Sequence, residues 1–252
     1  MTMELKNLVA ELNKYLKVEE IEDKSQNGLQ VEGKHQVKKV SFAVDACQDS
    51  FKKAVESNSN LLIVHHGLFW SEPKLLVGNH LKRIKFLIEN ELSLYACHLP
   101  LDLHPEIGNN IQIIKILGLT PENKFGNYHG TLIGYTGYYE DEMNLDDFIH
   151  KVQEKFNTKP VFFKFGGNMV KKVAVISGGG ADLITQIEDT EVDTFFTGEP
   201  KHEIYRYTKE IKKNIIFAGH YATETLGVKA LQKYIKDRFN LDTHFIDLPT
   251  GL

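Results

Sequence analysis

Two stretches of the chain resemble each other, and this repetition limits the fold more than any other feature of the sequence. Both contain the tetrapeptide Val-Lys-Lys-Val, at residues 37–40 and 170–173. In each stretch an apolar run later ends in a histidine, and an acidic residue follows that histidine four positions later. The two pairs are His98 with Asp102 and His220 with Glu224. Similar segments in the same order indicate an internal duplication. We therefore expect two related halves, residues 1–125 and 126–252, with no inserted third domain.

Apolar runs alternate with segments of helical periodicity, as in a chain of βαβ units. The pattern predicts strands at residues 37–44, 61–65, 92–97 and 193–197, and helices at residues 3–17, 48–57 and 108–117. Residues 128–139 are rich in aromatic and β-branched side chains, which favours another strand in a mixed sheet. Residues 144–156 begin with a capping-type signal for a helix. The expected fold class is α/β, with two intertwined, duplicated repeats, mixed sheets and a metal site between them.

The segment Leu61–Gly67, LLIVHHG, places two adjacent histidines at the end of a buried strand. Successive strand side chains point to opposite faces, so we expect both rings to lie where the strand stops, with Gly67 allowing the turn. Ligands of open α/β sheets bind at this carboxyl edge. A lone histidine is usually a core or surface residue. An adjacent pair, matched by a second histidine-plus-acid element, instead indicates metal binding.

The matching half supplies further candidate donors. Pairing the two halves aligns His65 and His66 with Gly198 and Glu199, and two similar halves facing each other would gather their strand ends. The i, i+4 spacing of His220 and Glu224 places both side chains on one face of a helix start. The expected constellation combines imidazoles and carboxylates, which suit divalent first-row metals. Its members are His65, His66, His98, Asp102, Glu199, His220 and Glu224.

Some polar segments have both a functional and an ordinary interpretation. The glycines of Ser177–Asp182 can cradle a phosphate or form a tight turn, and Asn27 and Gln30 can serve a site or a solvated loop, which is the favoured interpretation. His202 is a further catalytic candidate. Lys201 and Arg206 can attract an anionic substrate, although scattered basic residues usually form a solvated face.

Composition excludes several classes of protein. Two cysteines are too few for a disulfide framework, and no apolar run approaches the roughly 18 residues of a membrane span. The net charge of −4 gives no reason to expect a nucleic-acid or membrane partner. We expect a cytoplasmic protein.

Four motifs, taken together and in order, resemble the Nif-three-like family, whose members are often labelled GTP cyclohydrolase 1 type 2 homologues. They are NGLQVEG, HHG, HLPLD and GHYATE. The resemblance implies a toroidal homohexamer with two divalent cations in each subunit, which the sequence does not identify among Zn, Fe, Mn, Co and Ni. The implied ligands are His65, His66, Asp102, His220 and Glu224, with Glu224 bridging. His98 and Glu199 match positions just behind the ligands or nearer the substrate. One departure is Leu99-Pro100, where the family usually has Thr-Asn or a similar pair.

The leading hypothesis is a dinuclear metal-dependent hydrolase that acts on a small phosphate-bearing or nucleotide-like substrate, as a GTP cyclohydrolase or a phosphoesterase. Catalytic candidates are His98, Glu199 and His202. The alternative is a metal-binding assembly or adaptor protein whose ring matters more than catalysis, because a fold and a site do not fix a substrate.

Overall fold

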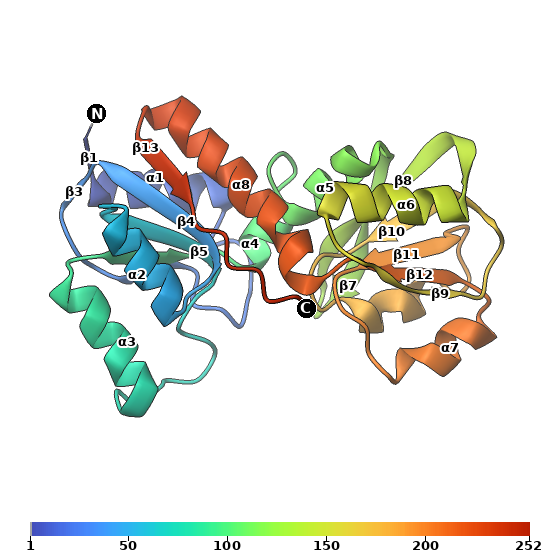
Figure 1. The fold of residues 1–252 in the computed structure, drawn as a ribbon, viewed down its shortest axis with the longest axis horizontal. Helices are drawn as coiled ribbons and strands as arrows, with labels where there is room; N and C mark the ends of the chain where they lie inside the picture. The colour runs from blue at the N-terminus through green and yellow to red at the C-terminus, as the bar shows by residue number, and fades with distance from the viewer. Residues whose placement is uncertain (1) are drawn as a thin grey trace. The chain divides into compact units, whose positions relative to one another are not determined.

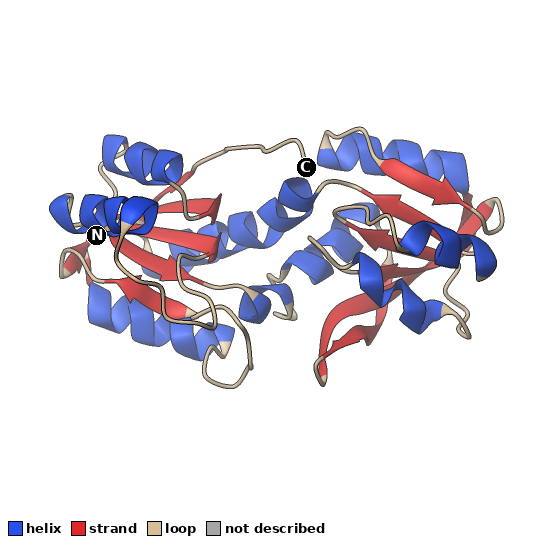
Figure 2. Ribbon diagram, turned by 90° about the horizontal axis from the view of Figure 1, so that it is seen from below, coloured by secondary structure: helices blue, strands red, loops and turns tan. Residues whose placement is uncertain are grey.

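The computed structural model describes residues 2–252, which form two compact units. The first unit contains the chain up to Leu101 and Val228–Leu248, and the second contains Asp102–Gly227 and Pro249–Leu252. Both are mixed α/β structures, as predicted, and Figure 2 distinguishes their helices from their strands. No helix within residues 2–252 is long and apolar enough to cross a bilayer.

The units are divided at helices. Helices α4 (Leu99–Asp102) and α8 (His220–Phe239) both contain a boundary between the two units. This division differs from the predicted halves, because residue 125 lies inside strand β7 (Thr120–Tyr128). Strand β7 and helix α5 (Asn109–Leu117) pack in the second unit, so the chain enters that unit before the second repeat begins.

The first unit is built on a five-stranded sheet of order β13-β4-β5-β6-β2 (Figure 1). Strands β13, β4, β5 and β6 run parallel, and β2 is antiparallel to β6. Helices α2 and α3 cover one face of the sheet through a core that contains Phe51, Leu62 and Leu87. The elements are β1 (Met3–Glu4), α1 (Leu5–Leu16), β2 (Gly28–Val31), β3 (Gln36–Val37), β4 (Lys39–Asp45), α2 (Gln48–Glu56), β5 (Leu61–His66), α3 (Gly78–Glu89), β6 (Ser93–Ala96) and β13 (Asp242–Phe245).

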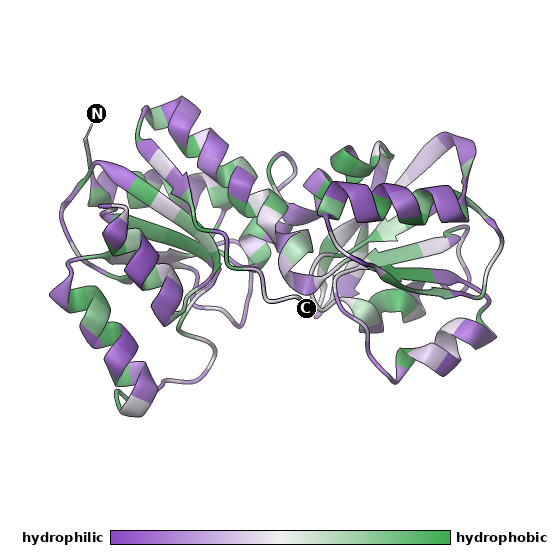
Figure 3. Ribbon diagram, in the orientation of Figure 1, coloured by the Kyte–Doolittle hydropathy of each residue, from purple (hydrophilic) through white to green (hydrophobic). Residues whose placement is uncertain are grey.

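Helix α1 confirms the amphipathic helix predicted over residues 3–17. Its buried side chains, Leu5, Leu8, Leu12 and Leu16, recur every three or four residues and so form one apolar face. The opposite face is polar, with Lys6, Glu11 and Lys14 exposed. Figure 3 shows hydrophilic and hydrophobic residues alternating along α2, α6 and α8 as well. The ring of Tyr15 stacks on that of Tyr234 with centroids 3.9 Å apart, which joins α1 to the part of α8 that belongs to this unit.

The second unit is built on a six-stranded sheet of order β7-β8-β10-β11-β12-β9. Strands β10, β11 and β12 run parallel, while β8 and β9 flank them as antiparallel neighbours. Helices α5 and α6 share one apolar core with the sheet, whereas η1 contacts β7 and β11, and α7 contacts β9. The elements beyond α5 and β7 are β8 (Thr131–Asn144), α6 (Leu145–Phe156), β9 (Val161–Lys164), β10 (Met169–Val175), the 3₁₀ helix η1 (Ala181–Ile187), β11 (Thr194–Thr197), α7 (Ile204–Glu210) and β12 (Asn214–Phe217).

Two local predictions have clear outcomes in this unit. Asn144 caps α6, because its side chain accepts a hydrogen bond from the amide of Asp146, as the capping-type start indicated. The strand predicted at residues 128–139 was wrong in its start. Tyr128 ends β7, and His129 and Gly130 form the turn of a hairpin, with φ of 50° and 90°. Positive φ at both central residues is the geometry of a two-residue hairpin turn.

Candidate metal centre

Three histidines of the first unit lie together at the carboxyl edge of its sheet. The ring centroids of His65 and His66 are 4.7 Å apart, and that of His98 lies 5.0 Å from His65 and 5.7 Å from His66. One nitrogen from each ring fits a group whose atoms all lie within 4.8 Å of one another. Three imidazoles gathered in this way can hold a metal ion.

The details at the strand end differ from the prediction. Strand β5 continues through both histidines, and the backbone of His66 is still paired with Asp45 of β4. Gly67 does not supply a turn with positive φ. Instead a Cβ there would lie 2.4 Å from the Gln30 amide and 2.6 Å from the Cβ of Ala96, so glycine permits a close approach of neighbouring segments.

The hydrogen bond of His65 defines which ring nitrogen can bind a cation. His65 is fully buried, and its Nδ1 lies 2.9 Å from the carbonyl oxygen of Cys97. A carbonyl can only accept, so Nδ1 carries the hydrogen and Nε2 carries the lone pair. The neutral tautomer with a lone pair on Nε2 is the one that ligates a metal. Cys97 is itself fully buried.

Carboxylates form hydrogen bonds with Nδ1 of the other two rings, those of His66 and His98. His66 Nδ1 lies 2.9 Å from Asp45 Oδ1, and His98 Nδ1 lies 3.0 Å from Asp23 Oδ2. An ionised carboxylate accepts only, so both rings again present Nε2 as the ligating nitrogen. A carboxylate behind a histidine is the usual arrangement around protein-bound metals, because it orients the ring and raises its basicity.

Asp23 is a site residue that sequence reasoning missed. Its side chain is 3% exposed, and burial raises its pKa, but hydrogen bonds from His98, Asn27 and the Leu99 amide outweigh this and lower the pKa to about 2. The carboxylate is therefore ionised at neutral pH and holds His98 from a loop 75 residues away in the sequence. No local motif surrounds it, so no pattern in the chain identified it.

The polar segment around the start of β2, which includes Asn27 and Gln30, also has a structural role at the site, contrary to the favoured interpretation as a solvated loop. Asn27 accepts a hydrogen bond from the backbone amide of His98 at 2.7 Å. Gln30 accepts a hydrogen bond from the backbone amide of Leu68 at 2.8 Å and so holds in place the backbone just after the histidine pair. Neither amide side chain is placed as a donor to the cation; each fixes the backbone that carries a candidate ligand.

The second unit contributes a second donor group around His220. Its Nδ1 lies 3.0 Å from Glu199 Oε2, and its Nε2 lies 3.1 Å from Glu224 Oε1. Glu199 follows strand β11, whereas His220 and Glu224 lie on the first turn of α8, one helical turn apart. Both ring nitrogens face carboxylates. The ring is then either a doubly protonated imidazolium or a neutral ligand whose Nε2 shares a cation with Glu224.

The glycines of Ser177–Asp182 lie against this donor group rather than forming a phosphate cradle. Gly178 has φ of +61°, and a Cβ there would lie 2.2 Å from Glu224 Oε1; at Gly179 the nearest atom is Glu199 Oε1, 3.2 Å away. Two carboxylates next to these backbones disfavour a bound phosphate. The tight-turn interpretation of the glycines is the one that the geometry supports.

Asp102 is the first residue of the second unit. The residue is 7% exposed, and its Oδ1 accepts hydrogen bonds from Asn109 Nδ2 at 2.8 Å and from Ser177 Oγ at 3.1 Å. Asn109 in turn accepts from the amide of Gly227 in α8 at 2.7 Å, which connects Asp102 to the helix that carries His220 and Glu224.

The predicted site residues thus form two groups, each within its own unit. His65, His66 and His98 gather in the first, and His220, Glu199 and Glu224 gather in the second. Imidazole nitrogens oriented by carboxylates, with further carboxylates beside them, are donors that suit a divalent first-row metal, so the residues fit such an ion. His202 is not part of either group: it lines a cavity beside α7.

The chain is similar to known proteins over nearly its whole length. The family model described as Duf34/NIF3 (NGG1p interacting factor 3) matches residues 3–250. A protein of Pyrococcus abyssi named "GTP cyclohydrolase 1 type 2 homolog" is 45% identical over 251 residues, which cover 99% of this chain and 100% of that protein. A protein of Archaeoglobus fulgidus with the same name is 41% identical over 250 residues, with 99% and 100% covered. The solved structure of TTHA1606 from Thermus thermophilus has a TM-score of 0.90 and 39% identity, over 99% of this chain and 100% of that one.

Proposed function

The chain belongs to the Duf34/NIF3 family, and from this premise we propose that it is a divalent-metal-dependent hydrolase of a nucleotide-like substrate. The observation that carries the proposal is the orientation of the candidate ligands. His65 presents Nε2 because a carbonyl holds its Nδ1, and His66 does so because a carboxylate holds its Nδ1. Fixing the ring and its tautomer in advance favours metal binding, because each ring then presents Nε2 without reorganising.

We assign two cations to five protein ligands. The imidazoles of His65 and His66, the carboxylate of Asp102, and His220 with Glu224 form the set. The family resemblance implies that Glu224 would bridge the two cations; its Oε1 lies 3.1 Å from His220 Nε2, and its side chain is 4% exposed. Zn, Fe, Mn, Co and Ni all accept these donors, so supply rather than donor type selects among them.

Bound cations of this kind supply Lewis-acid activation of water and of the bond under attack. The protein's own residues hold the ligands in place. Asp45 fixes the ring of His66, and Glu199 fixes that of His220, each through Nδ1. His98 is placed beside both strand histidines and is held by a carboxylate that is ionised at neutral pH, so it is suited to accept or donate a proton at Nε2. The name of the relatives points to ring opening of a nucleotide, and phosphoester hydrolysis would use the same donors.

The first test replaces single ligands and measures bound metal. We expect His65→Ala and Glu224→Ala to lower the metal content of protein purified without added metal to less than half, by elemental analysis. His35→Ala is the matched control, because the His35 side chain is 90% exposed and lies far outside the group. Circular dichroism should show the same fold in all variants. Metal content equal to that of the unmodified protein in both ligand variants would refute the assignment.

The second measurement separates hydrolysis from a purely structural use of metal. Metal-loaded protein is incubated with nucleotides and phosphoesters, and product is followed by chromatography. The proposal predicts turnover that is lost in His65→Ala and retained in His35→Ala. Metal at full content with no turnover on any of these substrates would favour a metal-binding assembly or adaptor protein instead.

We also propose, from the family resemblance, that the protein forms a homohexamer.

A further inference from the structure

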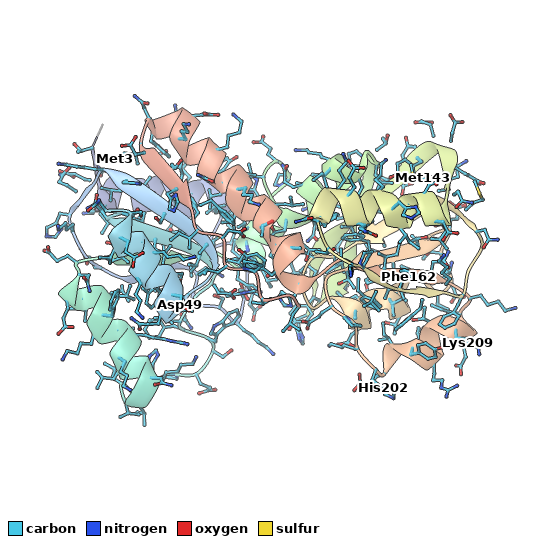
Figure 4. The ribbon with its side chains drawn as sticks, in the orientation of Figure 1. Met3, Asp49, Met143, Phe162, His202 and Lys209 are labelled. Carbon is cyan, nitrogen blue, oxygen red and sulfur yellow. The ribbon has the colours of Figure 1, made fainter. Side chains whose placement is uncertain are left out.

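A cavity beside helix α7 combines aromatic and basic side chains. It has a volume of about 490 Å³ and lies within the second unit. Its lining residues are Phe163, Pro200, Lys201, His202, Tyr205 and Arg206. Figure 4 labels His202 just before α7 and Lys209 near the end of that helix, which brackets the segment that forms one wall. The volume lies within the range of ordinary small-molecule sites.

One side of the cavity is an aromatic platform. The rings of Phe163 and Tyr205 meet edge to face with centroids 4.9 Å apart, and Phe165 supports Tyr205 at 5.2 Å. Phe163 is held in turn by Phe217 of the neighbouring strand β12, at 5.3 Å. Tyr205 is nevertheless 39% exposed. An aromatic ring that is fixed by its neighbours and still open to solvent can stack against a planar ligand.

The other side carries positive charge. Lys201 forms an ion pair with Asp182. Arg206 has no carboxylate partner among residues 2–252. A guanidinium offers a planar fork of donors that matches phosphate oxygens, whereas His202 supplies a nearby ring donor. Arg206 and a lysine already paired with Asp182 provide little positive charge, which suits a single phosphate group better than a triphosphate.

We propose that this cavity binds a nucleoside monophosphate, with the base on Tyr205 and the phosphate at Arg206. The inference deepens the proposed function, on which it rests for the role of the cavity as the substrate subsite. Pro200 follows Glu199 directly, so the same loop that orients His220 forms part of the cavity wall. A ligand here would therefore contact the segment that carries a residue of the metal group.

Binding is tested by calorimetry on metal-free protein with three probes: guanosine monophosphate, guanosine and inorganic phosphate. Guanosine monophosphate should bind more tightly than either fragment. Arg206→Gln should weaken the monophosphate about tenfold, which corresponds to about 1.4 kcal/mol, and leave guanosine unchanged. Tyr205→Leu should weaken both the monophosphate and guanosine. Lys209→Gln, a matched loss of charge on the same exposed helix, should have no effect.

Three results would overturn the proposal: no binding of the monophosphate to the metal-free protein, equal binding to the protein with Arg206→Gln, or equal affinity for inorganic phosphate and the monophosphate. Metal content is measured on the same preparations as purified, before the metal is removed for calorimetry. If the chain holds no metal but the monophosphate binds as described, the hydrolase proposal fails and the nucleotide site stands. If metal content is normal and the monophosphate does not bind, only the nucleotide site fails.

Discussion

At the scale of single residues, the sequence identified the candidate ligands but not the groups that orient them. Adjacent histidines after an apolar run are a recognisable pattern, because strand ends and metal ligands both have characteristic residue types. Asp23 has no such pattern. Its carboxylate acts on His98 only because the loop before β2 folds against the end of β6, a contact over 75 residues that periodicity cannot predict. Glu199 was identified as a candidate only because the repeat aligns it with His66.

Asp23 should make the free energy of unfolding of the metal-free protein depend on pH in the acid range. Its pKa falls from 3.8 to about 2 on folding, so the ionised form contributes stability that is fully present above pH 3.8 and is lost as the pH falls through about 2. The shift corresponds to about 2 kcal/mol in the free energy of unfolding. We expect the protein with Asp23→Asn to lack this part of the acid dependence in urea titrations between pH 4 and pH 2. The exposed Asp141→Asn serves as a control, and identical pH profiles for Asp23→Asn and the unmodified protein would contradict the assignment.

At the scale of elements, long periodic or apolar segments were predicted well and connections poorly. Helix α2 and strand β5 lie within one or two residues of their predicted bounds, because each buries a regular apolar face. The connection after Ser177 leads into the 3₁₀ helix η1 rather than an α-helix. Strand β7 was not predicted, because most of its residues are exposed and its apolar content is low.

The glycine turn after β10 provides a prediction about a single connection. Gly178→Ala places a Cβ 2.2 Å from Glu224 Oε1 at a φ of +61°, so the variant must both strain the backbone and displace a candidate ligand. Gly130 has a φ of +90°, and a Cβ there would meet nothing within 4 Å, so Gly130→Ala reports the backbone strain alone. The strain costs on the order of 1–2 kcal/mol. Urea unfolding should show a larger loss of stability for Gly178→Ala than for Gly130→Ala, and only Gly178→Ala should lower metal content. Equal losses and unchanged metal would show that Glu224 is not held by this contact.

At the scale of the whole molecule, the two sheets share an arrangement that supports the predicted duplication. The order β13-β4-β5-β6-β2 in the first unit corresponds to β8-β10-β11-β12-β9 in the second. In both, three successive parallel strands end in an antiparallel strand that precedes them in the chain. The strand registers align His66 with Glu199 and Asp45 with Gly178, as the repeat predicted. They place His98 opposite Gly219, one residue from the predicted partner His220.

Several apolar side chains are exposed to solvent in the single chain, and they offer a contact surface for the proposed hexamer. Leu75, Leu76 and Val77 are 80%, 54% and 64% exposed, and Ile88 of the following helix is 60% exposed. Contiguous exposed apolar residues of this kind usually mark an interaction surface, because leaving them in water is unfavourable. We expect the protein to sediment at six times its chain mass of 28.8 kDa. Replacing Leu75 and Leu76 by serine should lower the hexamer fraction at micromolar concentration, whereas Leu132→Ser, at a similarly exposed leucine of the β8 hairpin, should not. A monomeric unmodified protein, or a hexamer fraction that the double substitution leaves unchanged, would count against this surface as the contact between copies.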